Sequence, residues 1–260
     1  MDRTIHLSID QLHLSIGGLK ILNDISINIC KGDLFALIGP NGAGKTSLLN
    51  CLSGIYNPTQ GQLLFGGHDL AKLKSPEVAR IGIARTFQLT ELFRNMNVLD
   101  NLLLGRHIKM QKGLFSNGFF WRETIKEEVE HREVVERIIG FLELGRYRKN
   151  ESSTLPYGTQ KIVGLGRALA MEPQILLLDE PSAGMNHQEK EDLARFILRI
   201  KYEMGITLIW VEHDMQLVGD LADEIGVLNF GTKIAQGKPK EVLNDPEVIR
   251  TYLGTRAYMQ

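Results

Sequence analysis

Hydrophobic and polar residues alternate along the first thirty positions of the chain. Leucine or isoleucine occupies every second position in three short runs, at 5–9, 12–16 and 25–29. Such alternation is typical of strands that bury one face. Gly17-Gly18 and Asn23-Asp24 are turn-forming pairs. The pattern predicts an antiparallel sheet at the amino end, followed by a further short strand at 62–65.

Later in the chain, apolar runs alternate with helical patterns. A run without polar positions is typical of a parallel strand that is buried on both faces. We expect strands at 34–38, 81–88, 175–178, 207–211 and 225–228, with an edge strand at 233–235. Helical patterns cover 47–53, 76–79, 160–171, 189–202, 215–222, 239–243 and 246–252. This order predicts an α/β fold with a mixed, mainly parallel sheet.

Residues 97–165 depart from that pattern. Helical spacing of apolar residues predicts a helix near 98–103 and a charged amphipathic helix at 122–141. Between them, residues 111–121 carry aromatic side chains among glycines, either as a loop tucked under a helical subdomain or as an exposed contact patch. We expect one domain with a core at 1–96 and 166–236, a helical subdomain at 97–165 and a helical tail at 237–260.

Composition narrows the class of protein. Of 260 residues, 43% are hydrophobic and 23% are charged, as in an ordinary soluble protein. The net charge of −1 disfavours a nucleic-acid partner, and two cysteines are too few for a disulfide framework. No signal-peptide pattern begins the chain, and no apolar run reaches the roughly 18 residues of a membrane span. We expect a cytosolic protein that reaches a membrane only through a partner.

The strongest chemical signal is Gly39-Pro40-Asn41-Gly42-Ala43-Gly44-Lys45-Thr46, which fits G-x-x-x-x-G-K-T. It lies between an apolar run and a helical segment that starts at Ser47, as a phosphate-binding loop requires. Its glycines let backbone N–H groups point at phosphate, and the helix adds its positive end. Lys45 can reach the β- and γ-phosphates, and the Thr46 hydroxyl can ligate Mg²⁺. We expect these nine residues, Ser47 included, to bind a nucleotide.

Polar residues also follow other predicted strands. Asp179 ends the apolar run 176–178, from which its carboxylate can hold Mg²⁺ beside the loop. Glu180 comes next and can polarise an attacking water. His213 follows the run 207–211 at the same edge of the sheet, which favours contact with the γ-phosphate. Gln88, at another strand end, can contact Mg²⁺ or the water.

In this order and spacing, these motifs resemble the ATP-binding subunit of an ABC transporter over nearly the whole chain. The resemblance implies a P-loop NTPase (RecA-like) core with an N-terminal antiparallel β subdomain and an α-helical subdomain. It also implies ATP and Mg²⁺ as ligands. Glu180 and His213 would be catalytic, and Thr46, Gln88 and Asp179 would contact the metal.

The family also implies a signature segment, usually L-S-G-G-Q, which caps the ATP held by a partner subunit. The matching residues are Leu155-Pro156-Tyr157-Gly158-Thr159, of which Leu155 and Gly158 agree with the usual pattern. Pro156 replaces the serine and donates no hydrogen bond. Ile16 lies where the family places an aromatic residue against adenine, so an apolar contact is retained without stacking.

Longer strings are similar to the subgroup that serves branched-chain amino acid uptake. They are Arg85-Thr86-Phe87-Gln88, Leu92-Phe93-Arg94, Tyr157-Gly158, 181–186, 212–215 and 248–254. This likeness implies a second ATP-binding subunit, two transmembrane permease subunits and, indirectly, a solute-binding protein. The complex would lie at the cytoplasmic face of the inner membrane of a bacterium or archaeon.

Other functions stay open at this point. Urea and amide importers use close relatives of the same subgroup. A soluble ABC ATPase that acts on nucleic acid or ribosomes is disfavoured, because the chain has one module, no long heptad run and no basic excess. A metabolic P-loop kinase would leave Glu180 and His213 without the roles given above.

Overall fold

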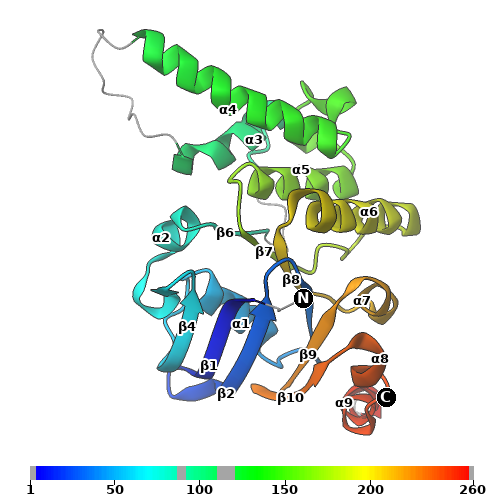
Figure 1. The fold of residues 1–260 in the computed structure, drawn as a ribbon. Coiled ribbons are helices and arrows are strands. Elements are labelled where there is room, and N and C mark those ends of the chain that lie inside the picture. Colours follow the sequence, from blue (N-terminus) through cyan, green and yellow to red (C-terminus); the bar gives the residue numbers. More distant parts are fainter. Residues whose placement is uncertain (1–3, 87–91, 110–120, 258–260) are drawn as a thin grey trace.

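The protein is described from a computed structural model that covers residues 4–86, 92–109 and 121–257. Two sheets form its base, and a group of helices lies at the opposite end (Figure 1). Among the helices of the described residues, none combines the length and apolar character that crossing a membrane requires.

The N-terminal sheet is antiparallel, as the alternating pattern predicted. Its strand order is β2-β1-β4-β5, with β1 at Ile5–Ile16, β2 at Leu19–Cys30, β4 at Gln60–Phe65 and β5 at His68–Asp69. Ile9 pairs with Ile27 on one side and with Leu63 on the other. All three side chains are buried, so the alternation in the sequence corresponds to one face of this sheet.

The second sheet carries the parallel strands, in the order β10-β9-β3-β8-β7-β6. Its strands are β3 (Leu34–Ile38), β6 (Ile83–Arg85), β7 (Ile175–Asp179), β8 (Thr207–Val211), β9 (Glu224–Asn229) and β10 (Thr232–Gly237). Only β10 among these described strands runs antiparallel to its neighbour. Every residue of β3, β7 and β8 is buried, as their continuous apolar runs predicted. The mixed, mainly parallel sheet is therefore confirmed.

Helices connect the strands, and α3, α4, α5 and α6 form the upper part of the molecule in Figure 1. Their bounds are α1 Lys45–Leu52, α2 Ser75–Arg80, α3 Val98–Arg106, α4 Trp121–Phe141, α5 Tyr157–Leu169, α6 His187–Met204, α7 Met215–Leu221, α8 Pro239–Val242 and α9 Pro246–Ala257. Short 3₁₀ turns cover Leu70–Lys72, His107–Lys109, Gly145–Tyr147 and Ser152–Thr154.

Helices α1, α5 and α6 begin two or three residues earlier than the sequence predicted. Helix α1 starts at Lys45, directly after Gly44, whose φ of 102° lies in the left-handed region. Helix α5 starts at Tyr157 instead of Gln160, with the extended Pro156 as its N-terminal cap. The Pro156 carbonyl accepts the Gln160 N–H at 3.0 Å, which closes the first turn. Tyr157 to Thr159 therefore belong to the helix.

Helices α3, α4 and α5 share a hydrophobic core with strands β7 and β8. The predicted apolar stripe of α4 is buried at Val135, Ile138 and Ile139, in the cluster that also contains Trp210. Val129 is also an apolar residue of this predicted amphipathic helix, but it is exposed. The helical part of the molecule and the parallel sheet therefore share one continuous hydrophobic core.

The side chain of Asn101 on α3 forms hydrogen bonds with the backbone of residues 93–97. Its side chain is fully buried, and its Nδ2 donates to the carbonyls of Phe93, Met96 and Asn97 and to Ser152 Oγ. Its Oδ1 accepts the N–H of Phe93 at 3.0 Å. One amide therefore bonds four backbone polar groups of this irregular turn.

Replacing Asn101 with leucine should lower the free energy of unfolding by about 2–4 kcal/mol, since each buried polar group left unpaired costs about 1–3 kcal/mol. Asn97→Ala is the matched control. It removes an N-terminal cap of α3 and should cost about 1 kcal/mol. Urea unfolding measures both values, and equal losses would contradict the buried role of Asn101.

Candidate functional site

The phosphate-binding loop leaves the end of β3 and runs into α1. Gly39 has a φ of 151°, and a Cβ atom there would overlap the carbonyl oxygen of Leu228 on β9. A Cβ on Gly44 would approach the Leu22 side chain at 2.7 Å. Both positions therefore require glycine, and the loop is held against the two sheets. The resulting concave backbone opens toward the amino end of α1, where an anion is favoured.

Lys45 points back into the loop. Its ammonium donates to the carbonyls of Gly39 at 2.7 Å and Pro40 at 3.0 Å, and the residue is buried. Burial lowers the pKa of Lys45, and the nearby charges of Glu180 and Asp179 oppose that shift. The cation therefore lies between the loop and the carboxylates that follow β7, where a phosphate group can be bound by both loop and lysine.

Asp179, the last residue of β7, is buried against Arg85 of β6. Its Oδ2 accepts from Arg85 Nη2 at 2.8 Å, and Arg85 also donates to Asn50 and Ser53 of the segment beginning with α1. The other oxygen, Oδ1, is buried and has no hydrogen-bond partner among the described residues. A buried carboxylate oxygen of this kind suits a hard divalent cation such as Mg²⁺. The residues present therefore fit the metal that the sequence implied.

Glu180 and His213 meet across the ends of β7 and β8. His213 Nε2 lies 2.8 Å from Glu180 Oε1. The Glu180 N–H donates to the Val211 carbonyl at 3.0 Å, and its φ of 47° is left-handed, which a non-glycine residue rarely adopts. Glu212 is buried and its Oε1 accepts the His213 N–H at 2.8 Å, so the histidine backbone is fixed from below.

A cavity of about 720 Å³ joins these groups. It is lined by Ile21, Glu180, His213 and the loop residues Asn41, Gly42, Ala43, Gly44, Lys45, Thr46 and Ser47. Its size suits a nucleotide. Sequence reasoning missed Ile21, a half-buried residue of β2 that lies in no motif. Ile16, predicted to contact adenine, is 46% exposed and is not among the lining residues. Its role stays a prediction.

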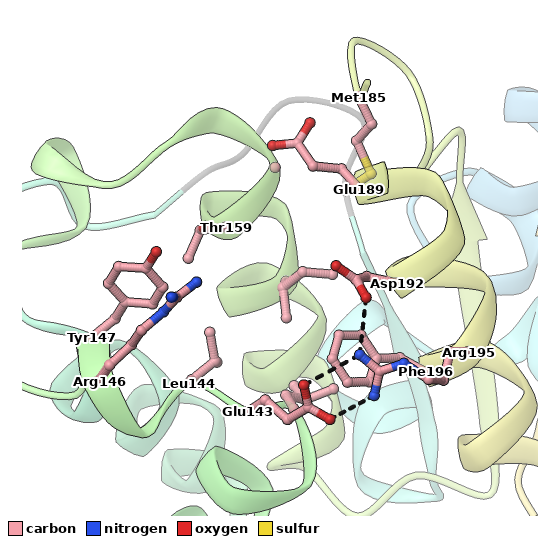
Figure 2. A pocket seen from close by; sticks show the side chains of 13 residues that line it. Glu143, Leu144, Arg146, Tyr147, Thr159, Met185, Glu189, Asp192, Arg195 and Phe196 are labelled. Carbon is pink, nitrogen blue, oxygen red and sulfur yellow. Dashed lines mark hydrogen bonds and ion pairs between the residues drawn. The ribbon is translucent and has the colours of Figure 1, made fainter. Parts of the chain in front are cut away.

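The remaining predicted residues lie elsewhere. Gln88 is outside the described residues. The signature segment Leu155 to Thr159 lies at the start of α5, and its Gly158 and Thr159 line a second cavity of about 410 Å³ beside α6. Figure 2 shows Thr159 across this cavity from Met185 and Glu189, with Arg195 paired to Glu143 and Asp192. Within this chain, the signature residues and the phosphate-binding loop therefore face different cavities.

Comparison with known proteins agrees with this geometry. The ABC transporter family model matches residues 22–183, and the model named branched-chain amino acid ATP-binding cassette transporter matches residues 232–258. The chain is 39% identical to the Escherichia coli high-affinity branched-chain amino acid transport ATP-binding protein LivG, over 95% of this chain and 97% of that protein. It is 35% identical to the corresponding protein BraF of Pseudomonas aeruginosa, over 98% and 99%.

Solved structures show the same fold. A nucleotide-free ATP-binding cassette from an ABC transporter superposes with a TM-score of 0.83 at 32% identity, covering 96% of this chain and 99% of the other. The ADP conformation of an ATP-binding cassette of an ABC transporter gives a TM-score of 0.84 with the same identity and coverage. Family model, relatives and fold agree along the chain. This protein belongs to the family of ABC transporter ATP-binding proteins.

Proposed function

We propose that this chain hydrolyses ATP to power an importer of branched-chain amino acids. The observation that carries the proposal is the meeting of Lys45, Asp179, Glu180 and His213 at the carboxyl ends of adjacent parallel strands. Its likeness to LivG and BraF along nearly the full length of each, and to the branched-chain family model at 232–258, supports the solute class. The chain itself would not contact the solute.

Binding of ATP uses the loop and its lysine. The backbone N–H groups from Gly42 to Thr46 and the positive end of α1 receive the β-phosphate. Lys45 exchanges its two carbonyl acceptors for phosphate oxygens. Thr46 Oγ1 and Asp179 Oδ1 would hold Mg²⁺, and the bound ion would supply positive charge to offset that of the phosphates. The Arg85 guanidinium holds Oδ2 of Asp179, which leaves Oδ1 for the metal.

Hydrolysis uses the Glu180 carboxylate. From the end of β7 it orients the attacking water and accepts its proton as the bond to phosphorus forms. His213 holds Oε1 of that carboxylate and can donate to the γ-phosphate on rotation of its ring. Glu180 follows β7 and His213 follows β8, and these two strands pair at Asp179 and Val211. The sheet therefore sets the distance between the two side chains.

The working assembly is proposed to contain a second ATP-binding subunit and two transmembrane permease subunits. The signature segment at the start of α5 would close over ATP held by the second subunit, again with a helix amino end facing phosphate. A solute-binding protein would deliver the amino acid outside the cell, and this chain would lie at the cytoplasmic face. The subdomain boundaries at 97 and 165 stay a prediction.

Exposed residues near the turn held by Asn101 are proposed to contact a permease. Phe93 is 54% exposed, whereas Leu92 is 9% exposed and belongs to the core. Phe93 is therefore the better contact, since removal of Leu92 would also destabilise the fold. The aromatic residues at 111–120 that formed the alternative patch lie outside the described residues.

Replacing Glu180 with glutamine should lower the ATPase rate by roughly 10²–10⁴-fold, the range expected for loss of a general base. ATP affinity should stay within about twofold, because the phosphate-binding loop is unchanged. Phosphate release and equilibrium nucleotide binding measure the two quantities. Turnover near that of the native chain would exclude Glu180 as the base.

Replacing Asp179 with asparagine should raise the Kd for ATP in Mg²⁺ at least about tenfold, because one anionic ligand is lost. In EDTA the Kd should stay within about twofold of the native value. Asparagine retains an acceptor for Arg85, so the variant should fold, although loss of the negative charge beside the buried guanidinium should lower its stability. Equal losses in Mg²⁺ and in EDTA would show that Asp179 acts on the loop and not on the metal.

Replacing Phe93 with alanine should reduce uptake of labelled leucine by cells at least about tenfold, as for a central interface anchor. The ATPase activity of the isolated chain should be unchanged. Phe230, which is exposed on the β9–β10 turn, supplies the matched control variant Phe230→Ala.

In the same assay, uptake of urea in place of leucine by the native complex would favour the urea importer.

A further inference from the structure

Glu180 is held in an unfavourable backbone conformation by contacts on several sides. Its positive φ costs of order 1–3 kcal/mol and persists only where surrounding groups fix it. The N–H is fixed by Val211 and the carboxylate by His213. The carbonyl is fixed from a different element, because Lys161 Nζ of α5 donates to it at 3.1 Å.

Lys161 makes a second bond to the same turn. Its Nζ donates to the Pro181 carbonyl, also at 3.1 Å, so one ammonium bridges two successive carbonyls after β7. The residue is 9% exposed; burial lowers the pKa of its ammonium, and the charges of Glu212 and Glu180 oppose that shift. Burying a lysine ammonium costs free energy of desolvation, which good hydrogen-bond and charge partners must offset. The Lys161 ammonium donates to the carbonyls of Glu180, the proposed base, and of Pro181.

The start of α5 touches the same turn at two more points. The Tyr157 ring packs on Gly184, where a Cβ would lie 2.9 Å from Cε1, and the Lys161 ammonium lies 5.4 Å from the centre of that ring. Gly158 is pressed against the carboxylate of Glu189 on α6. Figure 2 shows Glu189 and Met185 above the α5 start. The signature segment and residues 180–189 are thus packed as one unit.

We propose that Lys161 is a positioning residue that ties the signature helix to the catalytic turn of its own chain. Any displacement of α5 is passed through one ammonium to the Glu180 carbonyl. This rests on the proposed function, in which the signature segment closes over the ATP of the second subunit. Closure there then sets the position of the base at this chain's own ATP.

Three variants test the role of the ammonium. Lys161→Met fills the same volume without a donor, and it should lower kcat about 10–100-fold, as small displacements of a catalytic group do. Lys161→Arg can donate to both carbonyls and should recover kcat to within about fivefold. Lys201→Met is the control, since Lys201 is also a buried lysine but pairs with Asp223 away from the site. It should lose stability while keeping kcat.

The measurements separate positioning from folding and from binding. Lys161→Met loses a buried charge, so its thermal unfolding temperature should fall, as in Lys201→Met, while the protein stays folded at the assay temperature. Its Kd for ATP should stay close to that of the native chain, so that the loss of activity in the folded protein falls on kcat. A native kcat in folded Lys161→Met, an equal loss in Lys161→Arg, or a loss confined to the Kd would each overturn the proposal. Absence of ATPase activity in the native chain and in Lys201→Met would overturn the proposed function and this inference together.

A mixed dimer tests whether the link acts within one chain. With the catalytic glutamate of the second subunit replaced, the remaining turnover belongs to Glu180, and Lys161→Met should reduce it about 10–100-fold. With Glu180→Gln in this chain, the remaining turnover belongs to the other site, and Lys161→Met should change it less than about threefold. The opposite pattern would show that Lys161 acts through the signature segment on the partner's ATP.

Discussion

Val211 pairs with Leu37 on one side and with Asp179 on the other, and its carbonyl accepts the Glu180 N–H. This register sets the ends of β3, β8 and β7 level with one another. The phosphate-binding loop, the Asp179-Glu180 pair and His213 leave the sheet at those three ends. A shift of any strand by one residue would turn its side chains to the other face. The chemistry therefore depends on how three buried apolar strands align, more than on the polar residues alone.

Buried charge gives the site its second constraint. Lys45, Asp179, Lys161 and Glu212 are all nearly removed from solvent, and Arg85 is buried with Asp179. Each cation reaches a backbone carbonyl or a carboxylate, so burial is compensated locally. Removing one member would leave an unpaired charge in a low dielectric, which is strongly destabilising. The groups thus hold one another at fixed distances, as a site that binds a polyanion and a divalent cation requires.

Much of this arrangement could be predicted from the sequence, because its signals are local. Continuous apolar runs identified β3, β7 and β8, alternation identified β1 and β2, and the loop at 39–46 has a spacing that few other structures require. The misses share another cause. Arg85 bonds Asp179, which is 94 residues away in the sequence, and Lys161 bonds Glu180, which is 19 residues away. Ile21 reaches the cavity only because β2 packs beside the phosphate-binding loop. No local sequence pattern records such contacts. Leu92 and Phe93 are adjacent, yet only tertiary packing buries one and exposes the other.

The unusual signature segment takes on a different meaning in three dimensions. In the sequence, the residues that differ from L-S-G-G-Q relate only to the ATP held by a partner subunit. Pro156, at a φ of −53°, forms the extended cap from which α5 starts three residues earlier than its apolar pattern predicts. Tyr157 covers Gly184, and Gly158 leaves room for the Glu189 carboxylate, so both contact the segment that follows the catalytic turn. A serine and a glycine at 156 and 157 would supply a hydroxyl toward phosphate but neither the fixed cap nor the ring. The segment is therefore shaped by contacts within its own chain as well as by the nucleotide it would face.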